Sequence, residues 1–354
     1  MSDVVGITRE ELQLAARNHG MPLEALRYDV TPPGLHYLLI HYDIPQVDAD
    51  AWRLQVGGLV ARPLELSLAD LRGRTTITRA VTLECAGNGR ALLEPRPLSQ
   101  PWLLEAVGNA EWTGVALRDV LDEAGVRDGA VELVFTGLDR GVEGEIEQAY
   151  ERSLSVGDAM RDDVLLAFEM NGQPLLPQHG APLRLIVAGW YGMTSVKWLS
   201  RITAVSDVFD GYQMARSYRF RSDPDEVGEA VTRIRPRSLM VPPGIPEFLT
   251  RGRVVDAGTH EVEGRAWSGL GSIERVEFSD DGGATWAEAR LDRPHRDSST
   301  WRGWSIDWAA SPGEHVLSCR ATDSTGATQP LQPGWNVGGY ANNAVQRVTV
   351  VVRG

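Results

Sequence analysis

The chain has 354 residues, enough for two domains with large cores, and its hydrophobic (42%) and charged (23%) fractions are those of a globular protein. Its net charge of −13 argues against binding to nucleic acid or to an anionic membrane surface. No apolar run reaches the roughly 18 residues of a membrane span. The polar stretch from Met1 to Leu14 has no signal core, which predicts a cytoplasmic protein, or a periplasmic one if a leader was removed.

The first part of the chain mixes helix and strand patterns. Thr8 with Glu11 three residues later forms a capping-box pattern, which predicts one or two short helices between residues 8 and 27. Ser67 is placed to begin a short helix, and Gly125 is placed to end an amphipathic helix over 117–124. Apolar runs predict strands at 37–40, 52–56, 80–83, 165–170 and 183–187. We expect a mixed α+β domain over residues 1–236.

The pattern of the second part of the chain, after residue 236, predicts an all-β domain. Clustered prolines between residues 236 and 246 predict a linker. Beyond it, strand patterns recur at 273–278, 304–308, 316–321 and 345–351, and residues 280–283, Asp-Asp-Gly-Gly, indicate a hairpin. This spacing favours an immunoglobulin-like sandwich over residues 237–354. Cys319 lies in one of these strands and is expected in its core, and with Cys85 it gives no disulfide framework.

Cys85 has the most informative surroundings in the chain. It follows an apolar run and opens residues 85–90, Cys-Ala-Gly-Asn-Gly-Arg, whose Gly-Asn-Gly centre predicts a turn. A thiolate is a soft metal ligand, and a nearby cation such as Arg90 favours its ionised form. A buried structural cysteine beside a turn is the alternative.

Several polar residues lie at turns or strand ends. His179 lies on a turn and Arg184 begins a strand, while Lys197, the only lysine of the chain, follows a glycine-rich turn. Asp139 is expected at a strand end and His41 just after the strand at 37–40. Each alone is explained by a satisfied core histidine or a surface charge. An anionic cofactor would need such cations and neutral donors to converge.

Residues 82–90 resemble the molybdenum-ligand loop of the sulfite oxidase family, whose usual form is Cys-Ala-Gly-Asn-Arg-Arg. This chain departs at Gly89. Further matches extend from about Leu38 to Val350. The resemblance implies a mononuclear molybdenum held by one pterin dithiolene and by Cys85 as the single protein ligand.

The resemblance also implies roles for other residues. The family places pterin or phosphate contacts at the positions of His41, His179, Arg184, Ser195 and Lys197, and we add Asp139 to this cofactor-binding set. Cys85 and three further residues would form the catalytic site around the substrate: Arg90, Trp102 and Tyr218. Trp102 is nearly as well explained as a core aromatic.

Two departures concern the substrate. Leu39 and Gly338 stand where sulfite oxidases have substrate arginines. Losing one buried charge-assisted contact weakens binding by about 1.5–3 kcal/mol, tenfold or more. The chain has no Cys-x-x-Cys-His haem motif, so we expect no haem and a separate electron acceptor.

The favoured function is therefore molybdenum-cofactor-dependent oxo transfer, with sulfite oxidised to sulfate in a homodimer. A nitrate or sulfoxide reductase of the same fold is one alternative, as is a non-catalytic pterin-binding protein. An interaction protein built on the sandwich, with Cys85 incidental, is another. The sequence leaves open the physiological substrate, the reaction direction, the acceptor, and whether the pterin carries a nucleotide.

Overall fold

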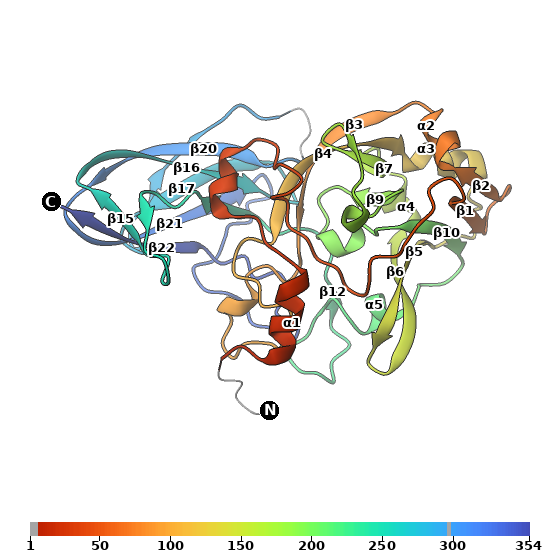
Figure 1. The fold of residues 1–354 in the computed structure, drawn as a ribbon, viewed down its shortest axis with the longest axis horizontal. Helices are drawn as coiled ribbons and strands as arrows, with labels where there is room; N and C mark the ends of the chain where they lie inside the picture. Colours follow the sequence, from red (N-terminus) through yellow and green to blue (C-terminus); the bar gives the residue numbers. More distant parts are fainter. Residues whose placement is uncertain (1–5, 296–298) are drawn as a thin grey trace.

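The computed structural model describes residues 6–295 and 299–354 and is built mainly of β-strands. The described part holds five short α-helices, of which α1 (Arg9–Arg17) is the longest with nine residues. Figure 1 shows two halves side by side, with the strands that follow residue 236 on the left. None of the helices in this described part is long and apolar enough to cross a bilayer. The part of the signal-sequence prediction that rests on residues 1–5 lies outside the described residues.

The first half contains two five-stranded sheets around a shared core. The strands of the first sheet are, in order, β2 (Leu64–Ser67), β1 (Arg53–Gly58), β10 (Leu199–Val205), β5 (Glu132–Glu143) and β6 (Ile146–Ser155). The second consists of β3 (Ile77–Glu84), β4 (Val107–Ala116), β7 (Val164–Met170), β8 (Gln173–Pro174) and β9 (Arg184–Val187), which pairs with β7. Residues of both sheets and of α3 (Leu117–Ala124) share the largest apolar cluster.

The local signals of the first half act as the sequence predicts. The Thr8 hydroxyl accepts a hydrogen bond from the Glu11 N–H (3.2 Å), and the Glu11 carboxylate accepts one from the Thr8 N–H (2.9 Å). Ser67 caps α2 (Leu68–Arg72), and Gly125 ends α3 with a φ of 66°. The other short α-helices and strands are α4 (Val156–Ala159), α5 (Tyr212–Ala215), β11 (Arg219–Phe220) and β12 (Glu229–Ala230), and the described part of this half also holds 3₁₀-helices at Leu23–Arg27, Arg90–Leu92, Pro177–His179 and Gly192–Thr194. The predicted strand at 37–40 is wrong, because that segment makes a single bridge between Leu38 and His19.

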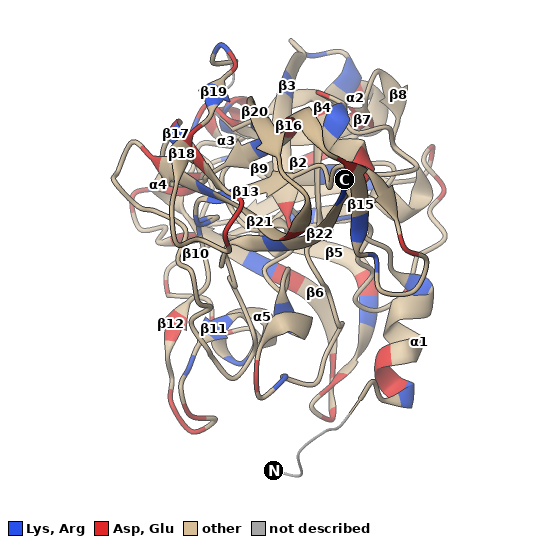
Figure 2. Cartoon of the chain, turned by 90° about the vertical axis from the view of Figure 1, so that its left-hand side faces the viewer, with Lys and Arg blue, Asp and Glu red and all other residues tan. Residues whose placement is uncertain are grey.

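The second half is a pair of sheets packed around one core. One sheet has the order β13 (Arg237–Met240), β16 (Gly258–Trp267), β20 (Arg302–Ala310) and β19 (Arg290–Leu291). The other has the order β14 (Ile245–Pro246), β15 (Arg253–Asp256), β22 (Gln346–Arg353), β21 (Gly313–Asp323), β17 (Ile273–Ser279) and β18 (Ala287–Glu288). Cys319 is fully buried between them and is a free thiol, as predicted. Figure 2 shows acidic and basic residues intermixed over this side of the molecule.

The proline-rich segment is not a solvated linker. Residues 237–240 form the buried strand β13, which pairs with β16, and Pro236 and Pro242 lie outside the strand. Prolines cannot donate to a ladder, so they flank this strand rather than interrupt it. The division of the chain at residue 236 stays a prediction.

Candidate active site

Cys85 lies where β3 runs into a tight turn. The carbonyl of Cys85 accepts a hydrogen bond from the Asn88 N–H (3.0 Å), and its sulfur accepts one from the Gly87 N–H (3.4 Å). Gly89 has a φ of 86°, and a Cβ there would lie 2.9 Å from the Asn342 side-chain nitrogen. The position where the resembling family has arginine is therefore left-handed and crowded in this loop, which favours glycine.

Cys85 is only 6% exposed. Burial raises its pKa, while the positive charge of Arg90 and the Gly87 N–H oppose that increase. A metal cation at the sulfur would supply the missing stabilisation of the thiolate. The local structure thus presents a single soft ligand at the end of a rigid strand.

Two cavities meet at Cys85. The lining of the first includes every residue predicted to bind cofactor: His41, Cys85, Asp139, His179, Arg184, Ser195 and Lys197. The lining of the second includes every residue predicted at the substrate: Cys85, Arg90, Trp102 and Tyr218. Cys85, Leu39 and His41 border both cavities. The structure therefore brings together all the predicted residues, although they are spread over more than 170 positions of the chain.

The first cavity is lined by two buried cations. The Arg184 guanidinium lies over the Trp112 ring (5.1 Å), and one of its outer N–H groups is 3.4 Å from the His179 carbonyl. Lys197 donates a hydrogen bond to the Leu39 carbonyl (2.6 Å). Burial lowers the pKa of Arg184 to about 10, and burial with the nearby charge of Arg184 lowers the pKa of Lys197. A bound anion would relieve both desolvated charges.

The other polar groups of the first cavity are set to contact a polar ligand. Burial lowers the pKa of both His41 and His179 to about 3, so each is a neutral imidazole near pH 7. The Ser195 hydroxyl accepts the Val187 N–H (3.2 Å), which leaves its own proton free to donate. Arg184 Nε and Asp139 Oδ1 are buried and find no hydrogen-bond partner among the described residues. These orphaned atoms, with the two cations, fit an anionic ligand that carries both donors and acceptors.

Asp139 corrects one expectation. It does not end a strand but lies within β5, where the pairing with β6 shifts between Thr136 and Arg140. The bulge leaves Asp139 4% exposed, and burial raises its pKa while the charge of Lys197 opposes this. Bulges commonly re-aim a side chain next to a functional site.

The second cavity is walled by aromatic rings. Tyr218 Oη and His41 Nε2 share a hydrogen bond of 2.5 Å, which links the two cavities. Tyr218 has a φ of 48°, a strained conformation for a bulky side chain. The Arg90 guanidinium lies over the ring of Tyr340 (5.3 Å), which in turn packs against the ring of Tyr218 at 5.1 Å. Sequence reasoning missed Tyr340, which no motif distinguishes from a core aromatic residue.

Comparison with known proteins decides the family. Residues 41–213 match the family model described as the oxidoreductase molybdopterin binding domain, and residues 230–353 match the Mo-co oxidoreductase dimerisation domain. Sulfite oxidase of Gallus gallus is 35% identical over 336 residues, which cover 90% of this chain and 72% of that protein. The chain belongs to the sulfite oxidase family. This is a family of molybdopterin-dependent oxidoreductases, as the resemblance implied.

Other proteins similar to this chain carry different names. Mitochondrial sulfite oxidase of Rattus norvegicus is 35% identical and NADH nitrate reductase 1 of Oryza sativa subsp. japonica 33% identical, each over 91% of this chain. The chain covers only 62% and 38% of those two proteins. The crystal structure of the sulfane dehydrogenase SoxCD from Paracoccus pantotrophus matches with a TM-score of 0.80 and 27% identity, covering 98% of this chain and 90% of that one.

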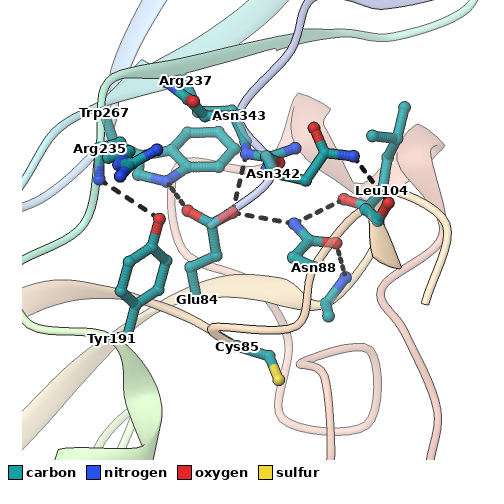
Figure 3. A network of polar contacts seen from close by, with 12 residues as sticks. Glu84, Cys85, Asn88, Leu104, Tyr191, Arg235, Arg237, Trp267, Asn342 and Asn343 are labelled. Atoms are coloured by element: carbon teal, nitrogen blue, oxygen red, sulfur yellow. Dashed lines mark hydrogen bonds and ion pairs between the residues drawn. The ribbon is translucent and has the colours of Figure 1, made fainter. Parts of the chain in front are cut away.

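In this family member the Cys85 loop is held by residues from the second half (Figure 3). The Glu84 carboxylate forms an ion pair with Arg237 (2.7 Å) and accepts hydrogen bonds from the Trp267 indole (2.8 Å) and the Asn88 amide (3.1 Å). The Asn342 amide donates to the Gly89 carbonyl (2.7 Å). Sequence reasoning missed this network. A charged Glu84 at the end of an apolar run was the available signal, because a buried carboxylate requires partners.

Proposed function

We propose that this protein carries out two-electron oxo transfer at a molybdenum centre beside Cys85, with oxidation of sulfite to sulfate as its specific reaction. The position of Cys85 on the boundary of two cavities carries this proposal. One cavity offers Arg184 and Lys197 to an anionic cofactor, and the other offers Arg90 to a substrate oxyanion. Relatives at 35% identity that are named sulfite oxidase support sulfite as the first substrate to test.

The residues of the first cavity would hold molybdopterin by charge and hydrogen bonds. Arg184 and Lys197 would bind its phosphate, Ser195 would donate to it, and the neutral rings of His41 and His179 would contact the pterin. Molybdenum, when bound, would supply the two-electron redox chemistry. Cys85 would anchor it at the end of β3.

The residues of the second cavity would orient the substrate. Arg90 is permanently charged and planar, which suits an oxyanion, and the Tyr218 hydroxyl lies within hydrogen-bond reach of the same space. Oxidation of sulfite consumes water, forms one sulfur–oxygen bond, and releases two protons and two electrons. The electrons would pass to a separate acceptor protein or small molecule, because they must leave before the next turnover.

Nitrate is a second candidate, supported by nitrate reductases at 33% identity and by the departures at Leu39 and Gly338. Both departures remove cations that a sulfite site would use, and nitrate carries a single charge.

We further propose that the first half is an α+β domain and that the second is an immunoglobulin-like sandwich that forms a homodimer. We also propose that the protein acts in the cytoplasm. Sedimentation at micromolar concentration should give twice the chain mass.

Metal analysis and X-ray absorption test the proposal. The purified protein should contain about one molybdenum per chain. Cys85→Ser should remove one Mo–S bond and abolish activity on sulfite and nitrate. Cys319→Ala, at a cysteine buried far along the chain in β21, should leave the Mo–S count and the activity unchanged. An unchanged sulfur count in Cys85→Ser, or a protein with molybdenum but no turnover of either substrate, would contradict the proposal, and the second result would favour a carrier.

A further inference from the structure

Arg152 is a fully buried cation that has no anionic partner. It lies in β6 and is 1% exposed, yet it forms no ion pair with any carboxylate that the structure describes. One of its outer N–H groups donates to the Gln213 carbonyl, and its Nε is buried without a partner among the described residues. Burial lowers the pKa of Arg152, and the surrounding tyrosines and Glu132 only partly oppose this.

A charge buried in this way costs stability. An unpaired ion loses its hydration on folding and receives no Coulomb attraction in return, and an apolar side chain of similar volume would avoid that cost. A group that breaks this rule is expected where its charge serves binding. The question is therefore which anion the Arg152 charge could attract.

The position of Arg152 answers this question. Its guanidinium lies over the Tyr218 ring, 5.3 Å from the centroid, and it contacts the backbone of Gln213. Tyr218 and Gln213 both line the second cavity, whereas Arg152 lines neither cavity. The charge therefore reaches the second cavity across one aromatic ring, through protein instead of water, so that it is weakly screened.

The lining of the second cavity leaves room for such a charge. Its described residues include one arginine, Arg90, and one carboxylate, Glu143, whose formal charges cancel. Leu39 and Gly338 stand where the resembling sulfite oxidases have arginines. A cation behind the wall of this cavity would restore the positive potential that its surface lacks.

We propose that Arg152 is a positioning residue for the substrate oxyanion, whose charge, held against the Tyr218 ring, attracts the anion into the second cavity. The same charge opposes the rise in the pKa of Tyr218 that burial causes, which makes the Tyr218 hydroxyl a stronger donor. The attraction acts on sulfite and nitrate alike. The inference rests on the proposed function, because the oxyanion must bind in the second cavity.

Binding of sulfate and nitrate to the oxidised, molybdenum-loaded protein tests this charge, because neither anion is reduced without added electrons. Arg152→Gln removes the charge but keeps an N–H donor for the Gln213 carbonyl. Calorimetry at low ionic strength should show sulfate binding weakened about tenfold and nitrate binding only about threefold, because a Coulomb energy scales with the charge of the ligand. A disturbed cavity wall would instead weaken both anions equally.

Two further variants separate charge from structure. Arg152→Lys keeps the charge at about pH 6 and should bind sulfate within about twofold of the unmodified protein. Because burial lowers the pKa of a lysine, its sulfate affinity should then fall about tenfold relative to the unmodified protein as the pH is raised to about 10. Arg140→Gln, which removes an exposed cation of the neighbouring strand β5, is the matched control and should change neither anion.

Three results would overturn the inference. They are equal losses for sulfate and nitrate in Arg152→Gln, equal losses in Arg152→Gln and Arg152→Lys at about pH 6, and no measurable binding of either anion to the unmodified protein. If Arg152→Gln does not fold, Arg152→Lys decides alone, and a relative sulfate affinity that stays level with pH would overturn the inference.

Turnover separates this inference from the proposed function. Arg152→Gln should raise the KM for sulfite about tenfold and leave kcat within about twofold, because a distant charge binds the substrate and its transition state alike. A protein that binds sulfate and nitrate as expected, yet turns over neither sulfite nor nitrate, would refute the proposed function and leave the role of Arg152 in anion binding supported.

Discussion

The Arg237 guanidinium and the Glu84 carboxylate form an ion pair of 2.7 Å in which each side chain is only 1% exposed. Glu84 immediately precedes Cys85, whereas Arg237 opens the first strand of the second half. The Arg237 side chain also donates to the Asn342 carbonyl, and the Asn342 amide holds Gly89. The conformation of the Cys85 loop thus depends on residues that lie about 150 to 260 positions later in the chain.

Arg237→Met should destabilise the apo protein by about 3–5 kcal/mol, because it leaves the Glu84 carboxylate buried without its cation. Urea unfolding measures this loss. Arg290→Met removes an exposed partner of Asp307 in the same half and should change stability far less, because water screens an exposed pair. Adding Glu84→Gln to Arg237→Met should recover part of the stability. Equal losses in Arg237→Met and Arg290→Met would show that the buried pair does not hold the loop.

Lys197→Ala and Arg184→Ala should each lower molybdopterin occupancy, because a phosphate would lose one of its two buried cations. We expect occupancy to fall about tenfold in each variant, with apo-protein unfolding changed far less. Pterin fluorescence after acid release measures occupancy. Arg201→Ala, at an exposed position of β10, should keep full occupancy. Full occupancy in both cavity variants would remove the support for a phosphate site there.

Arg90→Met should lower kcat/KM for sulfite by about 10- to 100-fold without lowering molybdenum content, because the main substrate cation is lost. Leu39→Arg should lower the KM for sulfite, because it adds a cation on the wall that both cavities share. In the unmodified protein the same KM should be high and should increase with salt. If neither substitution changes sulfite kinetics, sulfite does not bind in the second cavity.

The apo protein should lose stability in acid through two buried histidines. The pKa of His41 and of His179 is lowered by burial to about 3, whereas in an unfolded chain a histidine titrates near about 6.5. Below about pH 6.5 the unfolded chain therefore takes up protons that the folded protein does not, so the free energy of unfolding falls as pH falls toward 3. Above that value the two residues add no pH dependence.

Urea unfolding at a series of pH values between about 7.5 and 5 measures this slope, because that range spans the pKa of an unfolded histidine. His41→Gln and His179→Gln should each flatten it. His19→Gln, at an exposed histidine, should leave the slope unchanged. Part of the slope should survive in both variants, because burial also lowers the pKa of His36 to about 4. A slope that neither substitution reduces would contradict the prediction.

Local patterns predicted much of the fold, whereas the family resemblance named the residues that the structure brings together around the two cavities. The capping box at Thr8, the helix end at Gly125 and the alternating strands of the second half need only nearby residues, so the sequence displays them directly. The turn after Cys85 could be predicted because its glycines and the cysteine are contiguous in the sequence. The residues that hold this loop could not be predicted. Arg237, Trp267 and Asn342 have no distinguishing sequence pattern, and only the fold brings them against Glu84 and Gly89.

The predictions that proved wrong also failed because the outcome depends on contacts between distant segments. Asp139 was expected at a strand end, but a bulge lets β5 continue past it, and bulges leave no reliable sequence signal. The prolines around residue 240 suggested a linker because their local effect is to break structure, yet the four residues between them are all buried. Burial depends on what packs against a segment, which composition does not record.

The network around Glu84 has a consequence for work on fragments of this protein. A fragment that ends at residue 236 would retain Cys85 and every other side chain of the two cavities except Tyr340, and would lack the guanidinium, indole and amide that hold the cysteine loop. Such a fragment would have a complete set of ligands in an unsupported loop. Cofactor insertion should then require complementation by the missing half.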